Sequence, residues 1–300
     1  GRSKCILDPG KIKAVILIPR GFKIPNGLTA DKLEELCHAD RPNRIYPIKT
    51  VEEFAPTGGE ANVSATGYGG DKVTGYSAYT AALTLDNYDA SLKANLMMAK
   101  GVEFDAVIVD EDNVLFGTNR DATGMSGIAL SGVYPSGQDW DSSGQVANLI
   151  VNLMFKDYEK YIKTANVMAL DFDVVEALKG LVFVDLVKVG ENKYKLIEHF
   201  GGLNVTGYYA DALSKSAGKS FDGGVSAVSY ANGELTGDFD KAKLANYLNS
   251  YFMTAKQNVI ASYPYIGSDF KSGRYWSERT AETEGATVPQ LIYTDNGTSL

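Results

Sequence analysis

The sequence predicts an α+β fold that is dominated by strands, with an antiparallel, sandwich- or barrel-like N-terminal domain that also carries short helices. Two observations favour this class. Short apolar segments recur along the chain, and turns rich in Gly, Asn or Asp separate them. In the clearest example, residues 104–109 form one strand, residues 114–117 form its return, and Asp110–Asn113 is the turn between them.

The remaining N-terminal elements follow from the same kinds of pattern. Thr29 is expected to cap a short helix, and Gly101 to end a longer helix over residues 89–100. Residues 127–134 and 146–155 are expected to extend the 104–117 hairpin into an antiparallel meander of about four strands, with the chain broken at Pro135. Further strands are expected at residues 11–18 and 75–85, and further helices at 157–163 and 173–179.

The passage from Pro56 to Gly75 stands out because glycine occupies positions 58, 59, 67, 69, 70 and 75. This composition predicts a long exposed loop, and loops of that length in folded domains are usually functional or disordered. In an assembly such a loop would bridge to the next subunit.

The C-terminal part repeats the strand–turn–strand pattern, which indicates a smaller, immunoglobulin-like β-rich domain. Residues 181–189 and 194–200 form one expected hairpin, and residues 225–239 form another around Asn232-Gly233. An amphipathic helix is expected over residues 239–252. The predicted division is therefore residues 1–179, residues 180–270, and a polar C-terminal arm over 271–300. We expect this arm to order by docking on another copy or a neighbouring protein, and the alternative is that it folds back on its own domain.

Composition and charge narrow the function. The formal net charge is −8, and no basic stripe is present, so phosphate-driven binding of DNA or RNA is not expected. An acidic wall would still allow a duplex to slide through an assembly. No apolar segment approaches the roughly 20 residues that span a bilayer, so no membrane partner is expected. Two cysteines do not make a disulfide framework.

The sequence motifs that usually mark catalysis or ligand binding fail. The chain has only two histidines, His38 and His199, and neither accompanies a nucleophile motif. Gly218-Lys219-Ser220 lacks the glycine that a phosphate-binding loop needs at position 213. Val114 breaks the calcium-loop pattern that would start at Asp110. We therefore expect no catalytic residue, no cofactor and no metal, and an acid pair such as Asp139 and Asp141 gives only a remote hydrolase alternative.

The 18 tyrosines have two open interpretations. Tyrosine is enriched at protein interfaces, but it is also an ordinary strand-forming residue. The candidate subunit-interface residues are Tyr208, Tyr209, Tyr247, Tyr251, Tyr275, Trp276, Ile292 and Tyr293.

A family resemblance rests on four segments: Arg44–Ile48, Phe104–Asp110, Val114–Thr118 and Gly127–Gly132. Over roughly residues 10–160, the hydrophobic strand, Asp-rich turn and Gly-flanked strand resemble virion structural proteins of tailed phages that infect Bacteroidetes. The resemblance implies a tail tube, neck or collar ring, or capsid-associated role. It brings no catalytic residues with it.

Together these observations predict a structural subunit of a phage virion, most specifically a self-assembling tail tube or neck ring component. Its expected partners are copies of itself and other virion proteins, and its expected location is the virion, after assembly in the host cytoplasm. The alternatives are a capsid-associated protein and a host-surface or carbohydrate-binding module, for which Trp140 would be a candidate platform.

Overall fold

The computed structural model describes residues 9–38, 43–65, 67–140, 146–178, 181–182, 184–198, 202–207, 228–237, 274–280 and 287–294. The chain divides into two units, and the division falls between Leu178 and Lys179, beside the boundary expected from the sequence. The second unit also takes in the short segment 38–44. The predicted fold class is confirmed, because strands dominate both units and the helices are short.

The first unit is built on an antiparallel sheet of eleven strands and carries four α-helices among the described residues. The helices are α1 (Ala30–His38), α2 (Ala90–Met98), α3 (Tyr158–Thr164) and α4 (Val174–Ala177). The strands are β1 (Ile12–Pro19), β2 (Lys23–Pro25), β3 (Tyr46–Ile48), β4 (Val51–Thr57), β5 (Ala61–Ala65), β6 (Asp71–Tyr76), β7 (Thr80–Leu85), β8 (Phe104–Asp110), β9 (Val114–Thr118), β10 (Gly124–Ser126), β11 (Ile128–Asp139), β12 (Asn148–Phe155) and β13 (Ala165–Ala169).

Strands β1 and β8 form the centre of this unit. They pair antiparallel along their whole length, from Ile12 opposite Asp110 to Pro19 opposite Phe104. Alternate residues on one face, such as Ile16 and Val107, pack in one core cluster with residues of α1 and α4. The residues between them are buried as well, so both faces of these strands are covered. This explains why their sequences are continuous apolar runs, whereas β7 and β12 bury only every second residue.

The long strand β11 belongs to both halves of the sheet. It first pairs with β8 at Ile128 and Ala129, and then pairs with β12 from Leu130 onward. The register shifts between Leu130 and Gly132, at the point where β11 leaves β8. Bulged strands that change partners in this way form the corners of β-sandwiches and barrels.

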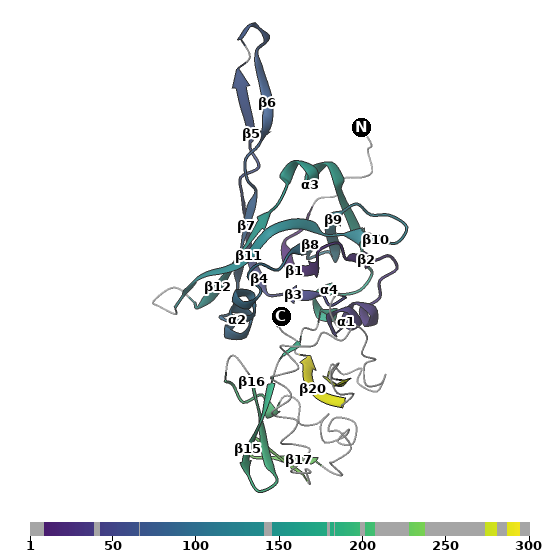
Figure 1. Cartoon of the computed structure of the whole chain (residues 1–300), viewed down its shortest axis with the longest axis vertical. Coiled ribbons are helices and arrows are strands. Elements are labelled where there is room, and N and C mark those ends of the chain that lie inside the picture. The colour runs from purple at the N-terminus through teal and green to yellow at the C-terminus, as the bar shows by residue number, and fades with distance from the viewer. Residues whose placement is uncertain are drawn as a thin grey trace. The chain divides into compact units, whose positions relative to one another are not determined.

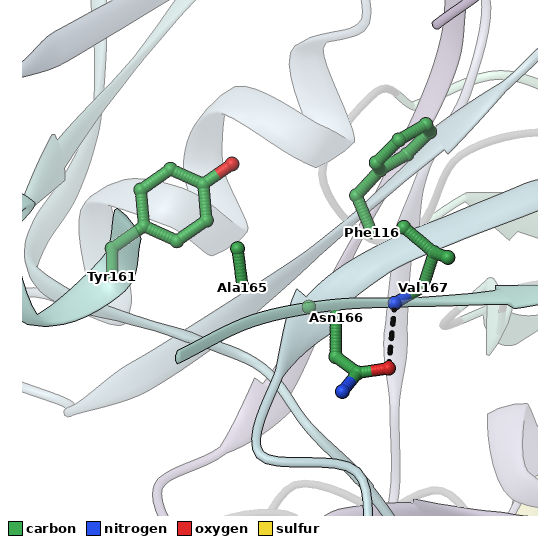
Figure 2. Close-up of a pocket in the computed structure, with 6 residues that line it drawn as sticks. Phe116, Tyr161, Ala165, Asn166 and Val167 are labelled. Atoms are coloured by element: carbon green, nitrogen blue, oxygen red, sulfur yellow. Dashed lines mark hydrogen bonds between the residues drawn. The ribbon is translucent and has the colours of Figure 1, made fainter. Parts of the chain in front are cut away.

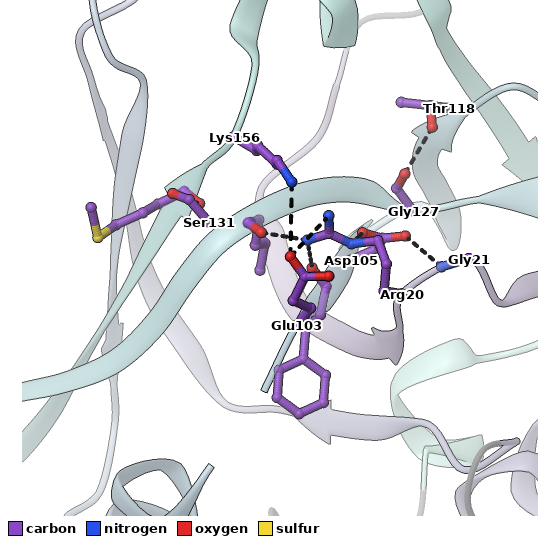
Figure 3. Close-up of polar contacts among 11 residues, drawn as sticks. Arg20, Gly21, Glu103, Asp105, Thr118, Gly127, Ser131 and Lys156 are labelled. Atoms are coloured by element: carbon purple, nitrogen blue, oxygen red, sulfur yellow. Dashed lines mark hydrogen bonds and ion pairs between the residues drawn. The ribbon is translucent and has the colours of Figure 1, made fainter. Parts of the chain in front are cut away.

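An arginine clamp holds this corner (Figure 3). Arg20 Nε lies 2.6 Å from Asp105 Oδ1, and Arg20 Nη2 donates to the carbonyl oxygens of Phe104 at 3.1 Å and Leu130 at 2.5 Å. The Asp105 side chain is 7% exposed. Burial raises the pKa of the Asp105 carboxyl, and the Gly21 amide and the Arg20 guanidinium offset this effect only in part. One guanidinium thus joins the end of β1, the start of β8 and the turning point of β11.

Four expectations for this unit are wrong in detail. Residues 56–75 are largely exposed but do not form a loop throughout, because β5 and β6 pair there in a hairpin with one register shift, between Asn62 and Val63. The chain does not break at Pro135; β11 continues to Asp139, and a second register shift after Pro135 accommodates the proline. The four-strand meander is also rearranged, since β11 pairs with β8 and not with β9. Helix α4 is shorter than the expected 173–179.

The described residues of the second unit form two small antiparallel sheets. Its strands are β14 (Leu181–Val182), β15 (Val184–Gly190), β16 (Lys193–Glu198), β17 (Val228–Ala231), β18 (Glu234–Gly237), β19 (Arg274–Thr280) and β20 (Thr287–Thr294). The orders are β15-β16-β18-β17 and β14-β20-β19. Asn192, Asn232 and Gly233 have the positive φ angles that the two predicted tight turns require. The expected helix over 239–252 lies outside the described residues.

The segment expected to form a C-terminal arm supplies β19 and β20. Strand β20 pairs with β14 of the same chain, with Leu181 opposite Thr294. This pairing favours the fold-back arrangement over docking on a neighbour.

The arginine clamp gives a first testable prediction. Replacing Arg20 with Met should lower the free energy of unfolding by about 3 kcal/mol, because the buried Asp105 carboxylate loses its counter-charge. The double variant R20M/D105N should recover part of this loss. Chemical denaturation measures both variants. The control is Lys163→Met, which removes an exposed ion pair with Glu159 and should leave the denaturation midpoint unchanged. A midpoint for R20M as high as that of K163M would contradict the assignment.

Candidate assembly surface

The most distinctive feature of the first unit is the hairpin formed by β5 and β6. It projects beyond β4 and β7, away from the other strands of the unit (Figure 1). The two strands form a sheet of their own, which no third strand joins in the described part of the chain. All residues of β5 are exposed, and so are all residues of β6 except Gly75. The hairpin therefore has no core beneath it.

The register of the hairpin sorts its side chains onto two unlike faces. Val63 lies opposite Val73, and Ala61 lies opposite Tyr76, so these four residues share one face. Ser64 lies opposite Lys72 on the other face. Val63, Val73 and Tyr76 are 55%, 58% and 44% exposed. The hairpin thus presents an apolar face to solvent and a polar face on its reverse; we call the first of these the apolar ribbon face.

Glycine fixes the base of the hairpin. Gly58 has a φ of +87°, and a Cβ there would lie 1.8 Å from the carbonyl oxygen of Ala78. The strands therefore approach each other more closely than any other residue type would allow. One step further along, the amide of Ser77 donates to the carbonyl oxygen of Glu60 at 2.9 Å, and the amide of Glu60 donates to Ser77 Oγ at 3.0 Å.

An aromatic cluster supports this base, with Tyr158 of α3 at its centre. The Tyr158 ring lies 5.8 Å from that of Tyr76 and 4.8 Å from that of Tyr79, measured between centroids. Tyr161, one turn further along α3, lies 6.4 Å from Tyr158. Burial raises the pKa of both Tyr79 and Tyr161, and repulsion from neighbouring tyrosines adds to the shift. These phenols therefore stay neutral, and the cluster behaves as apolar surface.

A hollow of about 270 Å³ opens beside this cluster (Figure 2). Its floor includes Phe116 of β9 and Val167 of β13, which lie opposite each other in the sheet, and Tyr161 forms another wall. Ala165, Asn166 and Gly117 complete the lining. Arg120 is bonded to one of the lining residues, because its Nη1 donates to the carbonyl oxygen of Val167 at 3.0 Å. Ring contacts link Tyr76 of the hairpin through Tyr158 to Tyr161 at the hollow.

The interface residues named from the sequence stay a prediction, because the structure describes none of their side chains. Tyr275 and Trp276 lie on β19, and Ile292 and Tyr293 lie on β20; of these the structure describes the backbone. The other four, Tyr208, Tyr209, Tyr247 and Tyr251, lie outside the described residues.

The residues that sequence reasoning missed are Val63, Tyr68 and Val73, together with the hollow. A signal for the hairpin was present, since residues 61–65 alternate small or apolar with polar side chains. The six glycines obscured it. The hollow leaves no comparable pattern, because Phe116, Tyr161 and Val167 come from different elements.

Of the motifs that resembled catalytic or metal sites, the turn at Asp110 is described, whereas His199 and Gly218-Lys219-Ser220 lie outside the described residues. Asp110 Oδ1 accepts hydrogen bonds from the backbone N–H groups of Asp112 and Val114, as an aspartate that stabilises a turn does. Across the described ranges, no group of three His, Cys, Asp or Glu side chains could hold a metal ion. In the part of the chain that the structure covers, no helix is both long and apolar enough to cross a membrane.

Comparison with known proteins adds no family: no protein-family model matches the chain, and no curated protein matches it either.

The close approach at the hairpin base gives a second prediction. Replacing Gly58 with Ala should destabilise the unit by clearly more than the roughly 1 kcal/mol that a left-handed alanine costs, because the new methyl group meets backbone. Gly27→Ala is the matched control, since Gly27 also has a positive φ but has nothing within 4 Å of its Cβ position. Thermal unfolding compares the two variants. Equal losses would show that Gly58 does not approach the Ala78 carbonyl oxygen this closely.

Proposed function

We propose that this chain is a repeated structural subunit of a tailed-phage virion, in the tail tube or in a neck or collar ring, and that the β5–β6 hairpin joins it to a second copy. The exposed apolar ribbon face is the observation that supports self-assembly. The assignment to a virion rests on the resemblance of residues 10–160 to phage structural proteins.

The hairpin is poorly explained as part of a monomer. An isolated two-stranded hairpin is marginally stable in water, and this one also leaves Val63, Val73 and Tyr76 in solvent. Covering side chains that are about half exposed contributes on the order of 1 kcal/mol each. The sum is small for one pair of molecules, but it is repeated at every joint of a ring or tube.

The geometry favours polymers over simple dimers. In the proposed contact, the hairpin of one copy packs on a different surface of the next copy. Such head-to-tail contacts generate closed rings or open filaments. The net charge of −8 suits this role, since the lumen of an acidic assembly repels phosphate and lets DNA pass. Other virion proteins would cap or flank the assembly.

A second candidate, a carbohydrate-binding or host-surface module, has one observation in its favour. Trp140 is 74% exposed, and its ring lies 6.2 Å from that of Tyr88 at an angle of 35°. Lys93 Nζ lies 5.7 Å from the centre of the Tyr88 ring. Exposed aromatic rings beside a polar group suit a sugar ligand. Loss of polysaccharide binding in a Trp140→Ala variant that still assembles would support this candidate.

The apolar ribbon face supplies the direct test of the proposal. The variant V63T/V73T keeps the shape and strand preference of both side chains but buries two hydroxyl groups wherever the face is covered. We expect the protein concentration needed for assembly to rise at least about tenfold, which corresponds to about 1.4 kcal/mol. Analytical ultracentrifugation and negative-stain microscopy measure the assembly.

The matched control changes the opposite face of the same two strands. S64N/K72S alters residues that neighbour Val63 and Val73 and should assemble like the parent chain. If both double variants assemble equally well, the apolar ribbon face is not the contact. If the parent chain stays monomeric at all concentrations, the structural role itself fails.

A further inference from the structure

The proposed self-assembly leaves open which surface receives the hairpin. We propose that the hollow between α3 and β13 of one copy receives the Tyr68 side chain from the hairpin tip of a second copy, and that Asp71 of the hairpin pairs there with Arg120. This inference rests on the proposed function, because it names the acceptor for the same hairpin.

The tip of the hairpin is shaped for insertion. Tyr68 is fully exposed, and Gly67, Gly69 and Gly70 surround it. A Cβ placed on Gly67 or Gly70 would have open space around it, so no neighbouring group crowds the turn. The tip is therefore a single aromatic ring carried on a narrow backbone. A fully solvated tyrosine gains apolar burial on entering a pocket and keeps its hydroxyl group available for water at the rim.

The hollow has the size and lining that an aromatic ring requires. An apolar cavity of roughly 150 Å³ accepts benzene, so the volume of about 270 Å³ admits a phenol ring together with its Cβ. Phe116 and Val167 offer an apolar floor, and Tyr161 presents its ring from α3 (Figure 2). Aromatic side chains that fill such pockets are the usual anchors of protein interfaces.

Charge complementarity supports the same pairing. Asp71 lies opposite Ala65 and therefore shares the apolar ribbon face with Val63 and Val73. Arg120 is bonded to a lining residue of the hollow, because its Nη1 donates to the Val167 carbonyl oxygen, and its Nε donates to Asn26 Oδ1 at 2.9 Å. These two bonds fix the guanidinium and leave further N–H groups of its fork for a carboxylate. A carboxylate three residues from the inserted ring thus meets a preorganised cation.

The tip cannot occupy the hollow of its own chain. The base of the hairpin lies beside the hollow, since Tyr76 contacts Tyr158 and Tyr158 contacts Tyr161. Strand β6 runs from Tyr76 to Asp71, and Tyr68 lies beyond its far end, so about 17 Å of extended strand separates the tip from the base. The contact is therefore made between copies, and each copy gives one tip and receives another. This is the continuous head-to-tail arrangement that builds a ring or a tube.

A mixing experiment tests the donor and the acceptor separately. Tyr68→Ala removes the donor and leaves the hollow open, whereas Ala165→Trp fills the hollow from an exposed lining position and leaves the tip intact. Each variant alone should be monomeric. An equimolar mixture should form a 1:1 heterodimer and grow no further, because only one productive contact exists between the two variants. Mass photometry measures these species, and Tyr134→Ala, an exposed tyrosine outside the hairpin and the hollow, should assemble normally.

A charge exchange provides the second readout. D71R and R120D should each raise the concentration needed for assembly at least tenfold, and the double variant D71R/R120D should return to within threefold of the parent chain. If the parent chain assembles but the mixture gives no heterodimer and the double variant shows no rescue, the hollow is not the acceptor, although the proposed function stands. If the parent chain never assembles, the proposed function and this inference both fail.

Discussion

The first unit carries an apolar ribbon face that the described residues cover only at its base, where Tyr158 packs against Tyr76. Register places Val63, Val73 and Tyr76 together, and water solvates them poorly. A two-stranded ribbon cannot bury its own face, because burial needs a second layer. Gly58 and the Tyr158 ring fix the base of the hairpin on the sheet, and the tip at Tyr68 is exposed to solvent.

The first unit is well suited to that task. The clamp of Arg20 on Asp105 ties together three strands at the corner where β11 changes partners, and the tyrosines of α3 brace the hairpin base. Such a scaffold fixes the direction of a long projection at little entropic cost on binding, since the backbone is already ordered at its root. The apolar ribbon face is then the part of the unit that changes its surroundings during assembly.

Much of this fold was predictable from local sequence, and the candidate surface was not. The apolar runs of β1 and β8, the Asp-rich turn at Asp110 and the Asn-Gly turn at Asn232 carry their structure within a few residues. The path of β11 depends on long-range pairing, so the expected order of strands was wrong. The loop prediction for residues 56–75 was wrong for a different reason. Glycine usually indicates turns, but Gly58 instead permits the close approach of its strand to the Ala78 carbonyl oxygen. The hollow arises from elements that only the fold brings together.

Hydrogen exchange of the hairpin amides tests the central claim most directly. Amides of residues 61–65 and 71–76 should exchange rapidly in the dilute monomer, because a lone two-stranded ribbon opens readily. In the assembled form the same amides should be at least about a hundredfold more protected. Amides of β1 and β8 serve as the internal reference and should be protected in both states. Equal exchange of the hairpin amides before and after assembly would contradict the claim that a second copy covers the apolar ribbon face.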